Sequence, residues 1–226
     1  MGLFMINIKG AIFDVDGTLL DSMPIWENMA AYYLIEQGVT PRPELNDELH
    51  ALGGHEIPQY FQTEYGLRQS AQKIQRGMYN LLEDFYFHKA QLKRGVVPVL
   101  EALRERGVKM CVATATDRHL IEPALKRCGL FDFFGRVFTC GEEQTSKRSP
   151  DIYIRAAAFL GTDIADTLVI EDALYAIKSA KKAGFPVAAV YDLSAKDNQD
   201  EIKSLSDYYY ATMDEFLTRT SRSVEC

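Results

Sequence analysis

Ile12-Phe13-Asp14-Val15-Asp16-Gly17-Thr18-Leu19-Leu20-Asp21-Ser22 is the stretch from which the rest of the chain is interpreted, because two carboxylates in it follow an apolar run and precede a glycine. The run from Ile8 to Phe13 predicts a buried strand, and Gly17 predicts a turn. If the strand extends through Asp14 and Asp16, both side chains point the same way, and like charges in one place require a cation, a proton or a function. An acidic surface turn would give the same pattern, so the rest of the chain has to decide.

The composition is that of a globular protein with an acidic balance. The chain has 226 residues, 47% of them hydrophobic, which suits one large domain or a medium domain carrying a smaller insertion. A net charge of -7 and a pI near 5.2 argue against non-specific nucleic-acid binding and against binding to anionic membranes, because both need a basic face. Any phosphate site must therefore be built from local positive charge.

The N-terminus and the cysteines favour a cytoplasmic protein. Met1 to Ile8 is too short and too poor in basic residues for a signal peptide, and no stretch approaches the roughly 20 apolar residues of a membrane span. The cysteines show no Cys-x-x-Cys spacing, which suits a reducing compartment. They are Cys111, Cys128, Cys140 and Cys226. We expect a monomer or weak dimer with neither nucleic acid nor membrane as a partner.

The segment 22–94 has helical periodicity and no convincing strand. Apolar residues recur at helical spacing from Trp26 to Leu34, and a second long periodic run covers Ala71 to Ala90. The breaks between the helices are Gly38 to Pro43 and the stretch Leu52-Gly53-Gly54-His55, which are rich in residues that end helices. We therefore predict an all-helical unit over residues 22–94.

From Gly95 onward short apolar runs alternate with amphipathic helices. Such alternation predicts an α/β fold with a doubly wound parallel sheet of the Rossmann-like kind. The expected strands are Val108 to Thr114, Arg136 to Thr139, Thr167 to Ile170, Pro186 to Tyr191 and Tyr208 to Ala211. The first strand, Ile8 to Phe13, has no better place to pair than in this sheet. The core is thus predicted to comprise residues 1–21 and 95–226, with the helical unit inserted after the first strand.

Two helices of the core carry clear start signals. Asp117 is predicted to cap one helix, which Gly129 closes. Ser149 is predicted to cap another, with Pro150 at its first helical position and Phe159 on its inward face.

Polar residues follow several of the predicted strands, at the edge where ligands bind in an open parallel sheet. Thr114 ends the second strand, Glu171 and Asp172 end the fourth, and Lys147 stands in the loop before a helix. Taken singly, Thr114 could cap a helix, Lys147 could be solvated, and the acidic pair could favour a helix dipole. It is much less probable that all of these separate roles occur at successive strand ends than that the residues share one site.

This set of residues resembles the four motifs of the haloacid dehalogenase (HAD) superfamily, over residues 9–216. The stretch from Asp14 to Ser22 matches the first motif without departure, Thr114 the second, Lys147 the third, and Glu171 with Asp172 the fourth. The helical insertion resembles the small cap of the beta-phosphoglucomutase-like and phosphatase-like branch. The chain departs from the family pattern at three positions that closely follow motif residues. These departures bear on the tuning of catalysis more than on the reaction class. They are Arg148, Ala173 and Ala176.

The resemblance implies metal-assisted phosphoryl transfer. Asp14 would be the nucleophile that forms an aspartyl phosphate, and Asp16 would protonate the leaving oxygen and then activate water. Mg2+ would offset the assembled negative charge, bound by Asp14, the backbone carbonyl of Asp16 and Asp172, with Glu171 acting through a bound water.

The remaining phosphoryl oxygens need donors and positive charge. Thr114, the adjacent Ala115 at the start of a helix, and Lys147 are the expected phosphate-binding residues.

Branches of the family differ in the residue type at a few positions, and this chain can be compared with each branch there. Dehalogenases and phosphonatases lack an acid at the position of Asp16. Phosphomutases of the beta-phosphoglucomutase type place a His where this chain has Trp26, and an Arg near Ile57. Substrate specificity is expected in the helical unit, where Gly54, His55 and Trp26 are the candidates; an ordinary connector and a core tryptophan are the alternatives.

The prediction is therefore a Mg2+-dependent phosphatase acting on a small phosphorylated metabolite, such as a sugar or polyol phosphate. A sugar phosphomutase is the alternative within enzymes. The alternative from another class is a non-catalytic module that senses or binds phosphate, whose mark would be a damaged acid or metal position.

Overall fold

The computed structural model describes residues 8–50 and 52–218, which form two compact units. The larger unit is Met1–Ser22 with Ala90–Cys226, and the smaller is Met23–Lys89. The expectations about the first residues and Cys226 lie outside the described residues. No helix within the described ranges is both long enough and apolar enough to cross a membrane.

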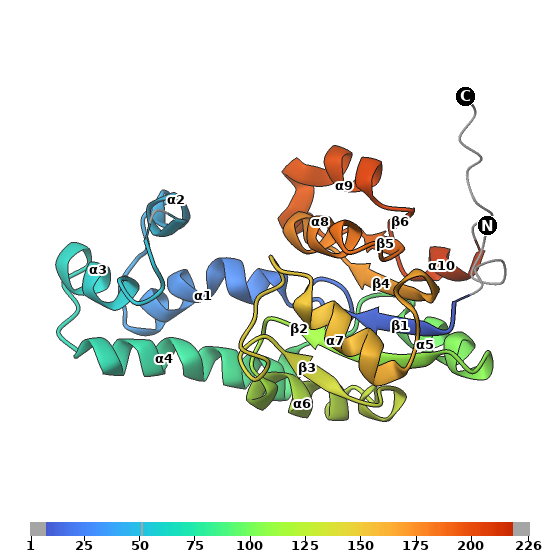
Figure 1. Cartoon of the computed structure of the whole chain (residues 1–226). Coiled ribbons are helices and arrows are strands. Elements are labelled where there is room, and N and C mark those ends of the chain that lie inside the picture. The colour runs from blue at the N-terminus through green and yellow to red at the C-terminus, as the bar shows by residue number, and fades with distance from the viewer. Residues whose placement is uncertain (1–7, 51, 219–226) are drawn as a thin grey trace. The chain divides into compact units, whose positions relative to one another are not determined.

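A six-stranded parallel sheet forms the centre of the larger unit, in the order β3-β2-β1-β4-β5-β6 (Figure 1). This confirms the predicted doubly wound α/β fold, with a helical insertion after the first strand. The strands are β1 (Gly10–Phe13), β2 (Lys109–Thr114), β3 (Val137–Thr139), β4 (Thr167–Glu171), β5 (Val187–Val190) and β6 (Tyr208–Tyr210).

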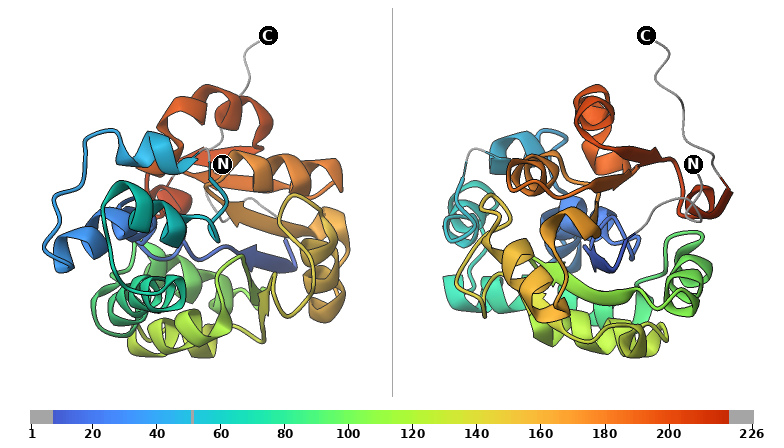
Figure 2. Two further views of the ribbon diagram at one scale, coloured as in Figure 1. Left: turned by 90° about the vertical axis from the view of Figure 1, so that its left-hand side faces the viewer. Right: turned by 45° about the vertical axis from the view of Figure 1, so that its right-hand side comes forward.

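Helices cover both faces of this sheet (Figure 2). Ile12 of β1 lies in one apolar cluster with Ile152 and Ala156, whereas its neighbour Phe13 points to the other face and is also fully buried. Successive strand residues alternate between faces, so burial of both sets requires two helical layers. The helices are α5 (Val96–Glu105), α6 (Arg118–Arg127), α7 (Asp151–Leu160), α8 (Leu174–Lys182), α9 (Gln199–Leu205) and α10 (Asp214–Thr218).

The strand order reverses between β1 and β4, because β2 lies on one side of β1 and the chain continues outward from β4 on the other. Ligands of open parallel sheets bind beyond the carboxyl ends of the strands at such a point. Asp14 directly follows β1, and Glu171 ends β4. The topology therefore brings the two acidic motifs to neighbouring strand ends.

The segment through which the chain leaves the larger unit is paired with the segment through which it returns. Leu20 and Leu92 form an antiparallel bridge. The Asp21 amide donates to the Gln91 carbonyl, and the Lys93 amide donates to the Leu19 carbonyl, both at 2.9 Å. Residues 90–94, which we expected in the helical unit, thus belong with the sheet.

The predicted helix starts are nearly right. Asp117 occupies the N-cap position of α6, but its side chain makes no capping hydrogen bond to a described residue. The start of α7 was misplaced by one residue: Pro150 is its N-cap, and the Ser149 hydroxyl donates to the Asp151 carboxylate.

The inward orientation predicted for Phe159 is wrong. Ile152 and Ala156 of α7 face the core as expected, whereas the side chain of Phe159 is 46% exposed. Its ring instead meets that of Phe138 edge-on at the margin of the sheet.

The smaller unit contains helices and no strand among its described residues, as predicted. Its core gathers Tyr33, Leu34, Phe61, Ile74 and Met78, among others. Gly77 allows Tyr33 to pack against its helix, because a Cβ at that position would lie 2.3 Å from the tyrosine ring. The elements are α1 (Met23–Glu36), α2 (Leu45–His50), α3 (Ile57–Glu64), α4 (Ala71–Asp84) and a π-helical turn, η2 (Phe85–Lys89).

Candidate active site

The loop after β1 is held in a tight turn. The Asp14 amide donates to the Ile170 carbonyl at 3.0 Å, which extends the pairing with β4 by one residue. The chain then folds back, with the amides of Leu19 and Leu20 both donating to the Val15 carbonyl. Gly17 adopts a φ of 82°, a conformation that a side chain would oppose. The Asp-Gly pair predicted as a turn is therefore a turn at a strand end.

Lys147 is buried and joins two strand ends. Its ammonium contacts Oδ1 of Asp14 and donates to Oε1 of Glu171 at 2.6 Å. The hydroxyl of Tyr153, on α7, donates to the same Glu171 oxygen at 2.7 Å. Three of the residues singled out in the sequence, from three separate segments, thus meet in one buried cluster.

Asp172 completes a set of three buried carboxylates. One oxygen from each of Asp14, Glu171 and Asp172 lies within 4.8 Å of the others. The Thr18 hydroxyl donates to Oδ1 of Asp172 at 3.2 Å. If all three carboxyl groups were ionised, the single ammonium of Lys147 would leave two negative charges without compensation.

The electrostatics of these groups reflect that imbalance. Burial raises the pKa of Asp14 to about 8; Lys147 opposes this rise, and the charges of Glu171 and Asp16 add to it. Burial, together with Asp14 and Glu171, raises the pKa of Asp172 well above its usual range. Burial alone would lower the pKa of Lys147, but attraction to Asp14 and Glu171 outweighs it and raises the pKa overall.

These residues fit a hard divalent cation. The second Glu171 oxygen, Oε2, is buried without a hydrogen-bond partner among residues 8–50 and 52–218. An unpaired buried carboxylate oxygen is costly unless a cation or an ordered water satisfies it. All the donors are oxygens, which Mg2+ prefers. A cation here would also offset the charge that raises the pKa of Asp14.

Asp16 lies beside this cluster and has different partners. The Ser22 hydroxyl donates to its Oδ1 at 2.6 Å, and the Thr116 hydroxyl donates to its Oδ2 at 2.7 Å. The side chain is half-buried. Its carboxyl group is therefore held in one orientation by two hydroxyls, and sequence reasoning assigned no role to either of them.

Two of the three predicted phosphate-binding residues, Thr114 and Ala115, lie at the end of β2. Thr114 is fully buried, and its hydroxyl accepts a hydrogen bond from the Thr116 amide at 3.1 Å. Ala115 is exposed in the bend between β2 and α6. Thr114 ends β2, the strand adjacent to β1, and Ala115 follows it, so both lie at the same edge of the sheet as Asp14.

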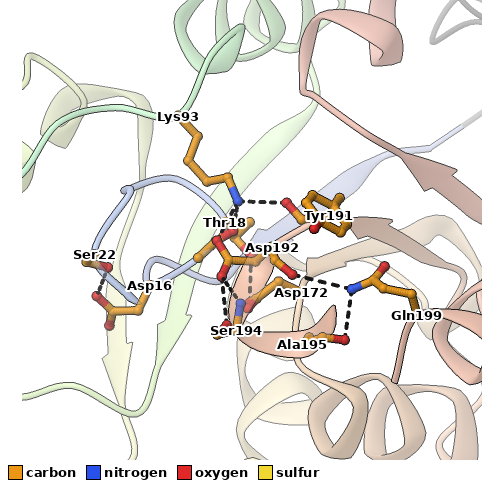
Figure 3. A network of polar contacts seen from close by, with 11 residues as sticks. Asp16, Thr18, Ser22, Lys93, Asp172, Tyr191, Asp192, Ser194, Ala195 and Gln199 are labelled. Atoms are coloured by element: carbon orange, nitrogen blue, oxygen red, sulfur yellow. Dashed lines mark hydrogen bonds and ion pairs between the residues drawn. The ribbon is translucent and has the colours of Figure 1, made fainter. Parts of the chain in front are cut away.

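A second ion cluster in the larger unit, partly buried, escaped the sequence analysis. Figure 3 shows Lys93 reaching the carbonyl of Tyr191 and the carboxylate of Asp192. The Lys93 ammonium also donates to the Gly17 carbonyl, and all three distances are 2.7 Å. Oδ1 of Asp192 accepts from the amide and the hydroxyl of Ser194. No local pattern marks Lys93, because its partners come from distant segments.

The candidate specificity residues Trp26, Gly54 and His55 all lie in the smaller unit. The Trp26 indole donates to the Tyr86 hydroxyl at 2.8 Å, and its side chain is 36% exposed. Gly54 and His55 are exposed. Their loop is closed by Glu56, whose carboxylate accepts from the Gly53 amide at 2.6 Å.

The departures from the family pattern have simple structural consequences. Arg148 stacks over the Tyr175 ring at 5.0 Å. Ala173 is the N-cap of α8, where it has no side-chain oxygen to cap the helix. Ala176 is fully buried.

Similar proteins support the assignment that the motifs suggested. N-acetylmuramic acid 6-phosphate phosphatase of Pseudomonas aeruginosa is 29% identical over 82% of this chain and 82% of its own length. Hexitol phosphatase B of Escherichia coli is 26% identical, over 78% of this chain and 81% of its own. The crystal structure of CbbY from Rhodobacter sphaeroides in complex with phosphate covers 92% of this chain and 96% of its own, with a TM-score of 0.72 and 21% identity.

A family model described as haloacid dehalogenase-like hydrolase matches residues 8–184. The matched segment includes the loop after β1, the end of β2, Lys147, and the acidic pair at the end of β4. It covers most of the chain, which confirms the resemblance seen in the motifs. The protein belongs to the haloacid dehalogenase-like hydrolases.

Proposed function

We propose that this hydrolase is a Mg2+-dependent phosphatase that acts on a small phosphorylated metabolite through an aspartyl-phosphate intermediate. The observation that carries the proposal is the buried cluster of Asp14, Glu171 and Asp172 around Lys147, in which three acidic groups face one ammonium. Relatives named as phosphatases support the reaction class.

The first chemical step is assigned to Asp14. Its carboxylate attacks phosphorus in line with the leaving oxygen, a new O–P bond forms, and the ester P–O bond breaks. Asp16 donates a proton to the departing oxygen, so the product is a neutral alcohol. Ser22 and Thr116 hold the Asp16 carboxyl group in place for this transfer.

The second step regenerates the enzyme. Asp16, now ionised, takes a proton from water, which attacks the phosphorus of the aspartyl phosphate. The acyl phosphate bond breaks, inorganic phosphate leaves, and Asp14 is again a carboxylate. One group thus serves as acid and then as base, which follows from its fixed position beside the nucleophile.

Charge stabilisation is shared among the other residues. Lys147 and Thr114, with the backbone at Ala115, would hold the phosphoryl oxygens that do not react. Asp14, Asp172, the Asp16 carbonyl and Glu171 would hold Mg2+, with Glu171 acting through a bound water. When bound, the cation supplies the positive charge that lets a phosphate approach two carboxylates.

A sugar or polyol phosphate is the proposed substrate class. The hexitol phosphatase and N-acetylmuramic acid 6-phosphate phosphatase among the relatives support a substrate of this size and polarity. The proposed specificity elements are Gly54, His55 and Trp26, since the sheet residues contact the phosphoryl group that all such substrates share.

A substrate screen tests the proposal. Phosphate release is measured for sugar, polyol and nucleotide monophosphates with Mg2+, with EDTA as the control. Release from at least one sugar or polyol phosphate, abolished by EDTA, is expected. Isomer formation from beta-glucose 1-phosphate with a bisphosphate activator, without net phosphate release, would instead establish a phosphomutase. Undiminished turnover after thorough chelation would rule out the metal.

A further inference from the structure

Tyr153 is a core residue whose hydroxyl has a polar partner in the proposed site. Its ring is fully buried and packs edge-on against Phe185, with the centroids 6.3 Å apart. It belongs to the apolar cluster between α7 and the sheet, together with Ile12. The ring is therefore fixed by packing, and its hydroxyl extends to Oε1 of Glu171 at 2.7 Å.

The two oxygens of Glu171 have different surroundings. Oε1 accepts hydrogen bonds from both the Lys147 ammonium and the Tyr153 hydroxyl. Oε2 is buried and has no hydrogen-bond partner among the described residues. The carboxylate thus has one saturated oxygen and one with its lone pairs free.

We propose that Tyr153 is a positioning residue: its hydroxyl, with Lys147, pins Oε1 of Glu171 and so keeps Oε2 available to the divalent cation or to one of its bound waters. This inference rests on the proposed function, because it assumes that the carboxylate cluster binds Mg2+.

Lys147 alone would hold Glu171 less firmly. Its ammonium is shared with Asp14, whose position changes when it attacks a phosphate. The terminal torsion of a glutamate is broad, so a carboxylate with one donor can turn and exchange its oxygens. The Tyr153 hydroxyl extends from a fully buried ring on α7, so we expect it to keep its position when Asp14 reacts. Partners of this kind, one shell beyond the metal, orient the ligands and tune metal affinity.

Replacement by phenylalanine isolates the hydroxyl, because Tyr153→Phe removes one oxygen atom and leaves the ring packing intact. Tyr209→Phe is the matched control: its hydroxyl donates to Oε1 of Gln199 at 2.7 Å, in the same unit and to an amide in place of one of the three carboxyl groups. Each variant loses one tyrosine hydrogen bond to a side-chain oxygen.

Binding of Mn2+ to the substrate-free protein is measured by titration calorimetry. Mn2+ shares the preference of Mg2+ for oxygen ligands and needs no turnover for its detection. Tyr153→Phe is expected to raise the dissociation constant about tenfold or more, whereas Tyr209→Phe leaves it within about twofold of the wild type. The titration stoichiometry reports the folded fraction, so partial unfolding lowers the stoichiometry and leaves the dissociation constant interpretable.

Equal affinities in Tyr153→Phe and the wild type would overturn the role of Tyr153 and leave the phosphatase proposal standing. Absence of Mn2+ binding to the wild type would overturn both. The half-activating Mg2+ concentration for phosphate release, measured on the same variants, is expected to rise in Tyr153→Phe alone. A merely structural role of the hydroxyl would lower stability without changing that concentration.

Discussion

Lys147 is a buried lysine and Lys93 a half-buried one of the same larger unit, and their surroundings differ in charge balance. Lys93 meets one carboxylate and two carbonyls, so its charge and its three N–H groups are all matched. Lys147 faces Asp14 and Glu171, with Asp172 close by. The Lys93 cluster has one acidic group for one ammonium, whereas the Lys147 cluster has three acidic groups for one ammonium.

The carboxyl groups show the same contrast. Burial would raise the pKa of Asp192, but Lys93 and Ser194 outweigh it and lower the pKa overall. The pKa of Asp14 is raised despite its contact with Lys147. A balanced buried pair belongs to the fold, whereas an unbalanced cluster is a place for a ligand of opposite charge. Variants in the two clusters should therefore respond differently, with the largest effect expected at Asp14 and the smallest at Asp192.

Replacing the nucleophile is expected to have the largest effect. Asp14→Asn should lower kcat for phosphate release by roughly 10^4-fold or more, because an amide cannot form the acyl phosphate. Circular dichroism should show an unchanged fold. A variant that kept a tenth of the wild-type rate would disprove the assignment of Asp14.

Breaking the balanced pair should damage stability. Lys93→Met leaves Asp192 buried without its cation and is expected to lower the free energy of unfolding by about 3–5 kcal/mol, measured in urea. The double variant Lys93→Met/Asp192→Leu should recover much of that loss, because no uncompensated charge remains. If the double variant were as unstable as the single one, charge balance would not explain this cluster.

Mg2+ should stabilise the unbalanced cluster and not the balanced one. At about 100 times its dissociation constant, the cation is expected to raise the free energy of unfolding by about 2.7 kcal/mol. Asp172→Asn should abolish this gain, and Asp192→Asn should keep it. Thermal unfolding with and without Mg2+ measures both. Equal gains in the two variants would place the cation elsewhere.

Removing one excess charge should stabilise the metal-free protein. Asp172→Asn takes away a buried carboxylate that other carboxylates repel, and is expected to raise the free energy of unfolding without Mg2+ by on the order of 1 kcal/mol. Urea unfolding in EDTA provides the measurement. A loss of stability would show that the hydrogen bond from Thr18 outweighs the repulsion.

The smallest expected effect is on the acid limb of stability. Because the folded pKa of Asp192 is lowered, its contribution is present above the unfolded value and is lost as the pH falls through the folded value. The stability difference between the wild type and Asp192→Asn should therefore narrow below about pH 4. A stability difference that did not change with pH would mean that the charge of the Asp192 carboxylate contributes nothing to the free energy of unfolding.

The sequence was sufficient for those residues whose place follows from strand position. Asp14, Glu171 and Asp172 follow apolar runs, and parallel strands bring their carboxyl ends to one edge. Lys147 could be placed there because it precedes a helix of the same layer.

Other residues could not be found in this way. Lys93 and Asp192 meet only because the loop after β1 and the end of β5 fold against residues 91–94. No sequence pattern in any of these segments indicates that they lie together. Tyr153 occupies a core position at helical spacing, so its hydroxyl is hidden within an apolar pattern. The exposure of Phe159 depends on where the sheet ends, which periodicity does not report.

The antiparallel pairing of residues 19–21 with residues 91–93 determines where a segment can be inserted into the larger unit. Because hydrogen bonds of the larger unit hold both exits side by side, whatever lies between them begins and ends at one fixed junction. Loop-closure entropy rises only slowly with length, so inserts of very different size could occupy that junction at similar cost. A helical unit of another length or sequence could therefore be inserted between residues 21 and 91 without breaking the pairing that holds the two exits of the sheet.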